Sequence, residues 1–305
     1  MRLGSILVDG KSHLCSVTSG GVLDLTKAAS TLGEGKSPRS IDEALGEWNE
    51  SLEWLTRFVG QLVRRPDVGN FLSDVQSAKF LPPLISPSKI LCVFVNYHSH
   101  GQEIGGAPTE PVFFFKHSRC IVGDGDEVFV PKFSAKADHE VELALIIGKE
   151  GKDIQPVEAY GYVAGYTVLN DISFRDGMKR GVEGTVLGRN LYRGKVADTS
   201  LPLGPYIVTR DEIPNPYPLK LALRVNGEAR QDGTTNDMIF KIPDLISGAS
   251  EDNTLLPGDI IATGTCSGVG LYTGKYLNDG DLVEAEVENV GILRSRIRFR
   301  QAKTT

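Results

Sequence analysis

Two glutamates stand two residues apart at the start of a strongly apolar run. Residues 137–148 show a polar–apolar alternation and many branched side chains before ending at Gly148, which predicts a single β-strand. Side chains two apart on a strand point to the same face, so we expect Glu140 and Glu142 to stand side by side. Two carboxylates this close repel unless a cation or solvent compensates their charge. The pair therefore indicates either a solvated edge strand or a metal site.

A third carboxylate follows at the end of a second strand-like run, residues 161–171, which delivers Asp171 at its end. Three carboxylates make an all-oxygen ligand set, which suits a hard divalent ion and not zinc or copper. The sequence thus predicts Mg²⁺ or Mn²⁺ on Glu140, Glu142 and Asp171, with Ca²⁺ as an ion that crystals could contain. Such a site leaves coordination positions for water and for an oxygen-rich substrate.

A histidine and a glutamate follow the strand predicted at about 90–95. His100 and Glu103 are three residues apart, so they share a face if the segment is helical. A carboxylate that orients an imidazole raises its basicity and makes a general base able to take a proton from water. The residues alone leave open the alternative of a surface histidine beside a glutamate.

Two basic residues could meet an anionic substrate. Lys195 can hydrogen-bond a developing oxyanion, although a solvated loop lysine is the simpler interpretation. The planar guanidinium of Arg175 fits a carboxylate bidentately, and the alternative is an ion pair with Asp171 or Asp176. The glycine-rich residues 263–270 match neither the dinucleotide fingerprint nor the Walker loop, so we do not expect nucleotide binding.

The composition is that of an ordinary globular protein with an acidic balance. The 305 residues can bury a sizeable core, and 40% are hydrophobic and 24% charged. The net charge of −6 argues against nucleic acid as a partner and favours a small anionic substrate over it. We see no signal-peptide pattern and no apolar run near the roughly 18–20 residues that cross a bilayer. We therefore expect a cytoplasmic protein with no membrane partner.

The first 80 residues are predicted to form a small α/β domain. It begins with short strands joined by tight turns. A capping box at Ser40 and apolar residues at helical spacing then predict a helix over about 41–64, stopped by the next proline. A proline-rich connector follows at 81–88, so we place the domain boundary there and expect a second domain over 81–305.

The second domain is predicted to be strand-rich. Asn226-Gly227 lies between alternating flanks and is typical of a hairpin turn, because both positions can take positive φ. The pattern favours a mostly antiparallel or mixed sheet structure. The expected strands cover about 90–95, 112–116, 141–148, 162–169, 206–209, 218–225, 259–263 and 282–299.

Short motifs occur in order from about Lys89 to about Arg296. They are Asn96-Tyr97-x-x-His100-x-x-Glu103, Phe115-Lys116, Glu140-x-Glu142-Leu143, Gly165-Tyr166, Asn170-Asp171-x-x-x-Arg175-Asp176, Gly194-Lys195-x-x-Asp198-Thr199, Pro202-Leu203-Gly204-Pro205, Val225-Asn226-Gly227-Glu228, and Pro257-Gly258-Asp259-x-Ile261-Ala262-Thr263-Gly264-Thr265-x-Ser267-Gly268-Val269-Gly270. In this order they resemble the fumarylacetoacetate hydrolase family.

The resemblance implies an α+β, mostly β fold, namely the mixed β-sandwich roll of fumarylacetoacetate hydrolase C-terminal domains with a small N-terminal α/β domain. It implies that His100 and Glu103 are catalytic, on a segment that orders over the bound ligand, and that Lys195 faces the active site. Members of the family usually form homodimers, so we expect a homodimer.

The resemblance also implies the substrate contacts. Arg175 would face the substrate, and Thr265 with the adjoining Gly264 would offer backbone and hydroxyl groups to a substrate carboxylate. Our leading expectation is a metal-dependent hydrolase that cleaves a carbon–carbon bond in a small 2-oxo or 1,3-dicarbonyl acid of the acylpyruvate or fumarylpyruvate type. An oxaloacetate-type decarboxylase on the same metal is the alternative. A sugar-acid dehydratase, an isomerase and a non-catalytic 2-oxo-acid binder are lesser options.

Overall fold

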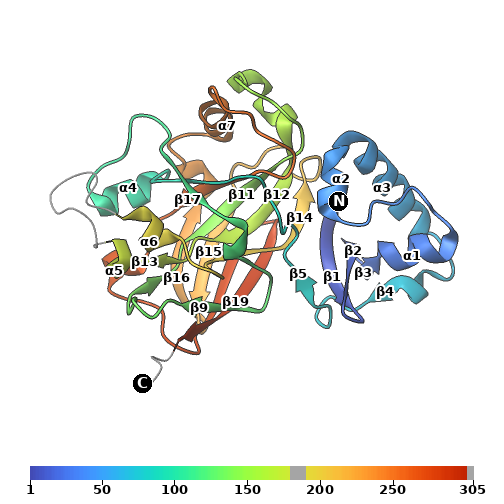
Figure 1. The fold of residues 1–305 in the computed structure, drawn as a ribbon, viewed down its shortest axis with the longest axis horizontal. Helices are drawn as coiled ribbons and strands as arrows, with labels where there is room; N and C mark the ends of the chain where they lie inside the picture. The colour runs from blue at the N-terminus through green and yellow to red at the C-terminus, as the bar shows by residue number, and fades with distance from the viewer. Residues whose placement is uncertain (179–189, 301–305) are drawn as a thin grey trace.

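The computed structural model describes residues 1–178 and 190–300, in which strands dominate (Figure 1). Within these residues the strands form a twelve-stranded, a five-stranded and a two-stranded sheet. Most neighbouring strands are antiparallel, with a few parallel pairs, and the sheets are open. The expected α+β, mostly β class is confirmed.

The elements have the following bounds. The large sheet runs in the order β4 (Leu72–Ser73), β3 (Gly21–Asp24), β2 (Lys11–Thr18), β1 (Arg2–Val8), β14 (Leu201–Thr209), β12 (Val163–Asn170), β11 (Val141–Ile147), β17 (Ile260–Thr265), β6 (Ile90–Val93) and β7 (Phe113–Lys116), with β5 (Phe80–Leu81) on β1 and β8 (Ile121–Val122) on β14. The other two sheets run β16 (Glu228–Thr234), β15 (Lys220–Val225), β18 (Leu282–Val287), β19 (Gly291–Phe299), β9 (Asp126–Val130), and β10 (Ala137–Asp138), β13 (Ser173–Phe174). The α-helices are α1 (Leu25–Leu32), α2 (Ile41–Gly46), α3 (Trp48–Leu62), α4 (His98–Ile104), α5 (Arg175–Met178), α6 (Leu191–Lys195), α7 (Ile242–Ser250) and α8 (Gly270–Thr273). Short 3₁₀ turns cover Val68–Phe71, Ser118–Cys120, Pro156–Tyr162 and Thr235–Asp237. Each expected strand segment beyond residue 89 overlaps an observed strand, and the segment 282–299 holds two, β18 and β19.

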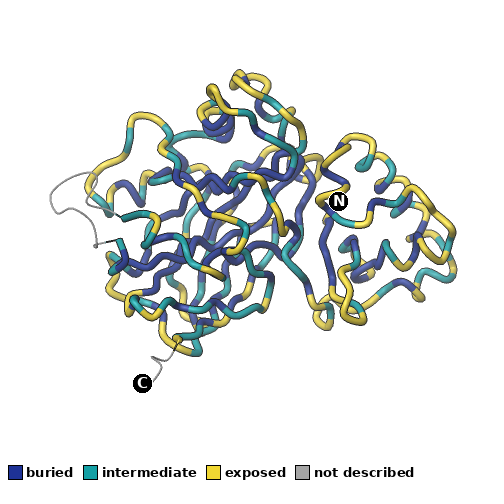
Figure 2. The backbone as a smooth tube through the Cα atoms, in the orientation of Figure 1, coloured by how far each residue is buried: buried dark blue, intermediate teal, exposed yellow. Residues whose placement is uncertain are grey.

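The central strand β11 is buried on both faces, as the continuous dark tube in the middle of Figure 2 shows. Alternate side chains on a strand face opposite ways, so each face needs its own apolar layer. Leu143 and Leu145 join a core with β15 and β18 of the five-stranded sheet. Ala144 and Ile146 join a second core that includes side chains of α2 and α3. The strand is therefore clamped between two layers, which suits a rigid support for a site at its end.

The N-terminal residues contribute to the same large sheet. β1 pairs with β14 in antiparallel register, so the blue region of Figure 1 continues the sheet of the larger region. The expected first strands and turns are confirmed, but the chain then forms α1, which the sequence did not lead us to expect. Its cap is Asp24, whose carboxylate accepts from the Lys27 N–H at 2.8 Å. The domain boundary at residue 81 stays a prediction.

Two helices, α2 and α3, replace the single helix predicted over about 41–64. Glu47, with φ −131° and ψ 57°, separates them. Gly46 directly precedes the break, and glycine is a weak helix former. The break still leaves Leu45 and Trp48 in one apolar cluster. The periodicity of the apolar residues continues across this break and therefore does not reveal it.

The single strand predicted over 137–148 is also two elements. β10 pairs with β13, β11 begins at Val141, and His139 and Glu140 lie between them. The Glu140 N–H donates to the Asn170 side chain at 3.0 Å and not to a neighbouring strand. Polar side chains therefore compete successfully with the backbone ladder at this point.

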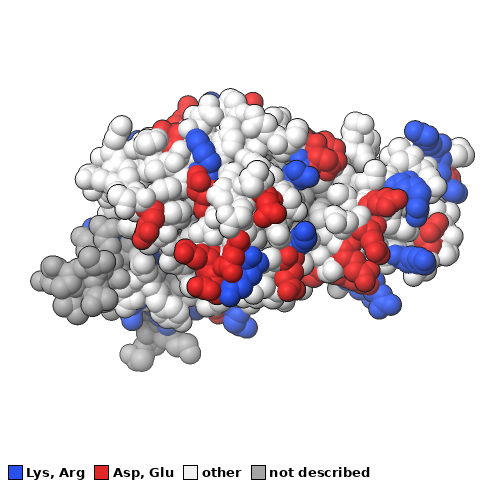
Figure 3. All heavy atoms as spheres, turned by 90° about the horizontal axis from the view of Figure 1, so that it is seen from above, with Lys and Arg blue, Asp and Glu red and all other residues white. Residues whose placement is uncertain are grey.

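The described surface carries mixed charge. On the face seen in Figure 3, lysine and arginine side chains stand scattered among aspartates and glutamates, and the described residues there form no continuous basic stripe. None of the helices within residues 1–178 and 190–300 combines the length and apolar character needed to cross a membrane.

Candidate active site

Three carboxylates meet where β11 begins and β12 ends. The antiparallel register pairs Val141 with Asn170, which brings Glu140 and Glu142 beside Asp171. One ligand oxygen from each lies within 4.8 Å of the others, and all three side chains are buried. The structure therefore brings together the three residues that the sequence selected as metal ligands.

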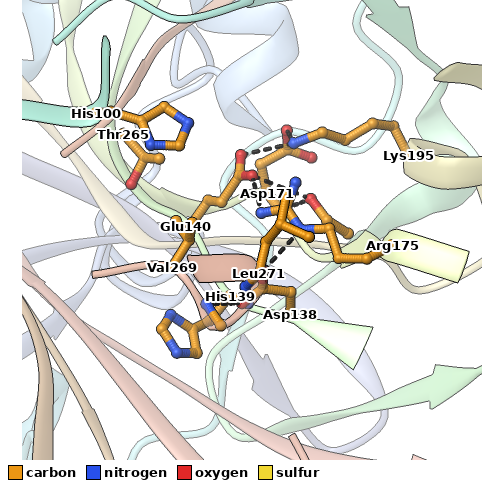
Figure 4. Close-up of polar contacts among 12 residues, drawn as sticks. His100, Asp138, His139, Glu140, Asp171, Arg175, Lys195, Thr265, Val269 and Leu271 are labelled. Carbon is orange, nitrogen blue, oxygen red and sulfur yellow. Dashed lines mark hydrogen bonds and ion pairs between the residues drawn. The ribbon is translucent and has the colours of Figure 1, made fainter. Parts of the chain in front are cut away.

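Basic side chains compensate two of the three carboxylates. Lys195 Nζ lies 2.6 Å from both Glu140 Oε2 and Asp171 Oδ2, and Arg175 Nη2 lies 2.5 Å from Glu140 Oε1. In Figure 4 Lys195 and Arg175 approach from one side of Glu140, with His100 on the other. Burial alone would raise the pKa of Glu140, but the charges of Lys195 and Arg175 outweigh it and hold that pKa below its usual range.

Glu142 has no such partner. Among the described residues its carboxylate accepts from the Gly264 N–H at 2.7 Å and forms no ion pair with a basic side chain. Burial, together with the charges of Asp171 and Glu140, raises the pKa of Glu142 well above its ordinary value. The cluster is thus a buried set of oxygen donors in which Glu142 has no cationic partner among the described residues. These residues fit a hard divalent cation.

Lys195 is buried yet stays charged. Burial alone would lower the pKa of Lys195, but the carboxylates of Asp171 and Glu140 outweigh it and raise that pKa above its usual value. The Lys195 ammonium also lies 5.2 Å from the centre of the Phe114 ring. Lys195 thus lies at the carboxylate cluster, where its ammonium can stabilise negative charge.

His100 and Glu103 share one face of α4, as their spacing predicts. His100 Nδ1 lies 3.0 Å from Glu103 Oε2. A carboxylate only accepts, so Nδ1 carries the hydrogen in the neutral ring and Nε2 keeps a lone pair for proton transfer. In Figure 4 the His100 ring lies on the side of Glu140 opposite Lys195 and Arg175. The structure therefore combines a general-base pair with the carboxylate cluster.

The glycine-rich segment 263–270 holds carboxylates of the protein itself. The N–H groups of Gly264, Gly268 and Gly270 donate to the carboxylates of Glu142, Glu103 and Asp138 at 2.7, 2.8 and 2.6 Å. A Cβ at Gly268, where φ is +102°, would lie 2.2 Å from the Arg230 carbonyl oxygen. Only glycine fits this position without displacement. The segment holds the carboxylates of Glu142, Glu103 and Asp138, a role that sequence analysis missed.

Arg175 has other partners than we expected. Its Nε lies 2.7 Å from Asp138 Oδ2, and its second contact is Glu140. The proposed ion pair with Asp171 or Asp176 is therefore wrong in its partners. Asp138 is a site residue that sequence analysis missed, although it continues the two-residue spacing of the glutamates.

Thr265 ends β17 and does not lie in a loop. Its Oγ1 donates to the Val141 carbonyl at 2.8 Å and accepts from the Gln231 amide at 2.8 Å. The hydroxyl that we expected to meet a substrate carboxylate is thus engaged within the fold. Gly264 contacts the carboxylate cluster through its N–H, which donates to Glu142.

The family model described as fumarylacetoacetate (FAA) hydrolase C-terminal matches residues 89–298. The mitochondrial oxaloacetate tautomerase Fahd2a of Rattus norvegicus is 43% identical over 221 residues, covering 72% of this chain and 69% of the relative. The oxaloacetate tautomerase YisK of Bacillus subtilis (strain 168) is 37% identical over 286 residues, covering 90% and 92%.

Solved structures agree with this picture. The maleylpyruvate hydrolase from Sphingobium sp. SYK-6 in complex with manganese(II) ion and pyruvate superimposes with a TM-score of 0.74 at 29% identity, covering 99% of this chain and 100% of that one. The fumarylacetoacetate hydrolase from Exiguobacterium antarcticum gives a TM-score of 0.77 at 30% identity, covering 98% and 100%. The chain therefore belongs to the fumarylacetoacetate hydrolase family.

Proposed function

We propose that this protein is a divalent-metal-dependent enzyme that interconverts the enol and keto forms of a small 2-oxo diacid of the oxaloacetate type. The single observation that carries the proposal is the junction of the three buried carboxylates with Lys195 and the His100–Glu103 pair. The two tautomerase relatives support this reaction above the hydrolysis that the sequence led us to rank first.

The chain's own carboxylates would hold the metal. Glu140, Glu142 and Asp171 are the ligands for Mg²⁺ or Mn²⁺, which when bound supplies a Lewis acid to the oxygens of a 2-oxo acid. The manganese in the maleylpyruvate hydrolase structure supports this choice. Glu140 and Glu142 lie where the clamped strand β11 begins, which gives these two carboxylates a rigid support.

His100 would move the proton. Its Nε2 takes a proton from C3 of the keto acid. The electrons of that C–H bond form the C2–C3 double bond, and the keto oxygen becomes negative. Return of a proton to that oxygen gives the enol, and the reverse steps give the keto form. Glu103 keeps Nδ1 protonated throughout, which reserves Nε2 for this transfer.

Lys195 would stabilise the negative oxygen. Its ammonium stays charged because two carboxylates lie 2.6 Å away. A fixed cation aimed at a developing oxyanion is among the strongest contributions to catalysis in a buried site. Both tautomerisation and carbon–carbon cleavage develop such an oxyanion, so Lys195 serves either reaction.

A direct assay tests the proposal. The purified protein with Mg²⁺ or Mn²⁺ should accelerate the loss of the enol absorbance of oxaloacetate, and chelator or Glu142→Ala should remove the acceleration. Carbon dioxide should be followed in the same reaction. A rate equal to that of buffer would refute tautomerisation, and metal-dependent carbon dioxide release would instead assign the oxaloacetate-type decarboxylase.

Carbon–carbon hydrolysis is the second candidate. The maleylpyruvate hydrolase neighbour favours it, as does the His100–Glu103 pair, since an oriented imidazole can activate water. Acetylpyruvate and fumarylpyruvate assayed in parallel should give pairs of acids if the enzyme is a hydrolase.

We further propose that the enzyme works as a cytoplasmic homodimer. A purely monomeric species in light scattering would contradict the dimer.

A further inference from the structure

Lys116 is a buried lysine whose role neither the sequence motif nor the mechanism above assigns. It ends β7, and its side chain is 0% exposed. Its Nζ lies 2.5 Å from Asp171 Oδ1, 2.8 Å from the Ser200 carbonyl and 3.2 Å from the Ile172 carbonyl. An ammonium has three hydrogens, and each has an acceptor here. The direction of the Lys116 ammonium, and hence of the carboxylate it contacts, is therefore fully specified.

The two oxygens of Asp171 face different lysines. Oδ1 contacts Lys116 and Oδ2 contacts Lys195, which also bridges to Glu140. Two residues before Lys116 on the same strand face, Phe114 lies beneath the Lys195 ammonium at 5.2 Å. One face of β7 thus supports both Asp171 and its second cation, and fixes which oxygen is directed at the other metal ligands.

The Ser200 contact extends this support. Ser200 Oγ donates to the Lys195 carbonyl at 3.3 Å, and the Ser200 carbonyl accepts from Lys116. Lys116 therefore ties together the turn that follows Asp171 and the segment that carries Lys195. Asp171 and Lys195 are 24 residues apart in sequence, and Lys116 contacts both segments from β7.

We propose that Lys116 is a positioning residue that holds Asp171 in the orientation required for divalent-metal binding. The inference rests on the metal site of the proposed function. Groups that orient metal ligands in this way typically change metal affinity by about 10–100-fold when they are removed. Lys116 touches neither the metal site's other ligands nor the substrate atoms in the mechanism, so its effect passes through Asp171.

The direction in which metal affinity changes distinguishes a positioning role of Lys116 from a purely electrostatic one. Loss of a nearby cation should by Coulomb attraction alone tighten the binding of a divalent ion. Loss of a positioning contact should weaken it, because the Asp171 carboxylate gains rotational freedom. A purely structural ion pair should change stability and leave metal affinity unaltered.

The chain offers a matched control in Lys89. Its Nζ lies 2.8 Å from the buried carboxylate of Asp259, which also accepts from two backbone N–H groups. Lys89→Met therefore removes a lysine–aspartate pair away from the carboxylate cluster. It should lower stability without changing metal binding.

The test measures Mn²⁺ binding to the full chain by calorimetry, with the Mn²⁺ spin-resonance spectrum as a second readout. We expect Lys116→Met to weaken binding by about tenfold or more and to alter the spectrum. Lys89→Met should leave both unchanged. Equal or tighter Mn²⁺ binding by Lys116→Met would overturn the inference.

A measurement on the unaltered protein covers the case in which Lys116→Met does not fold. With ¹⁵N-labelled lysine, the side-chain resonance of Lys116 should shift when Mg²⁺ binds, and that of Lys89 should not. An unshifted Lys116 resonance at saturating Mg²⁺ overturns the inference. If the wild-type chain binds neither ion in a manner that depends on Glu142, the metal site of the proposed function itself is refuted.

Discussion

One face of β11 changes character along its length. Glu142 lies on the same side of β11 as Ala144 and Ile146, and Glu140 directly precedes the strand. The two glutamates make polar contacts, whereas Ala144 and Ile146 pack in an apolar core. Burying charge without full compensation costs stability, whereas burying apolar surface supplies it. The polar start of the strand therefore serves the candidate site, whereas the apolar part that begins two residues later stabilises the fold. Substitutions in each half should move different measurements.

Glu142→Ala should have the largest effect on activity. Removal of this ligand should lower metal-dependent turnover by about 10³-fold, since a bound Lewis acid contributes several kcal/mol to the transition state. The metal-free variant should unfold at equal or higher denaturant concentration, because the carboxylate without a cationic partner is gone. Turnover with Mg²⁺ and urea unfolding check the two halves of this prediction. Full activity of the wild-type protein in chelator would contradict a metal-dependent role for this part of the strand.

His100→Ala should reduce turnover by about 10²–10⁴-fold, the range for loss of a general base. Metal binding should persist, because His100 is not a ligand of the carboxylate cluster. Mn²⁺ titration of the variant beside the activity assay distinguishes the two functions. Wild-type turnover would remove His100 from the mechanism.

Gly268→Ala should act through Glu103. A Cβ would meet the Arg230 carbonyl at 2.2 Å, so the loop must shift and displace its N–H from Glu103. Misplacement of about 1 Å near a catalytic group can cost about 10²-fold in rate. Gly280→Ala is the matched control, since φ is +84° there and no atom lies within 4 Å of the added Cβ. Both variants should lose stability, but only Gly268→Ala should lose turnover.

Ile146→Ala should have the smallest effect on activity. Truncation of this buried side chain should lower the free energy of unfolding by about 2–5 kcal/mol. Turnover per folded molecule should stay near that of the wild type, because the side chain packs in the core that includes α2 and α3. Urea unfolding and kinetics on the same preparation test this. A loss of turnover larger than that of Gly268→Ala would show that the two halves of β11 are coupled.

Local sequence pattern was sufficient to predict that Glu140, Glu142 and Asp171 come together. The spacing of Glu140 and Glu142 sets their common face, and the two adjoining apolar runs form the antiparallel pair that brings Asp171 alongside. The face shared by His100 and Glu103 likewise follows from their separation on a helical segment. Each of these relations depends on the period of one element or on two neighbouring strands.

The interruptions of the predicted elements were not visible in sequence. Periodicity favoured one helix across Glu47 and one strand across His139, and both are broken. At the strand break the Glu140 N–H bonds to the Asn170 side chain in place of a neighbouring strand. Residue propensity and hydrophobic period report only the local preference for a helix or strand, not the tertiary contacts that compete with it.

The sequence by itself determined the fold family, the grouping of the three carboxylates and the common face of His100 and Glu103. Only the tertiary structure decided how these charges are compensated. Lys116 reaches Asp171 across 55 residues, Arg175 reaches Asp138 across 37, and the Gly264 N–H reaches Glu142 across 122. Such pairings depend on how strands are ordered in a sheet, and a buried charge selects its partner by proximity after folding, not by spacing along the chain.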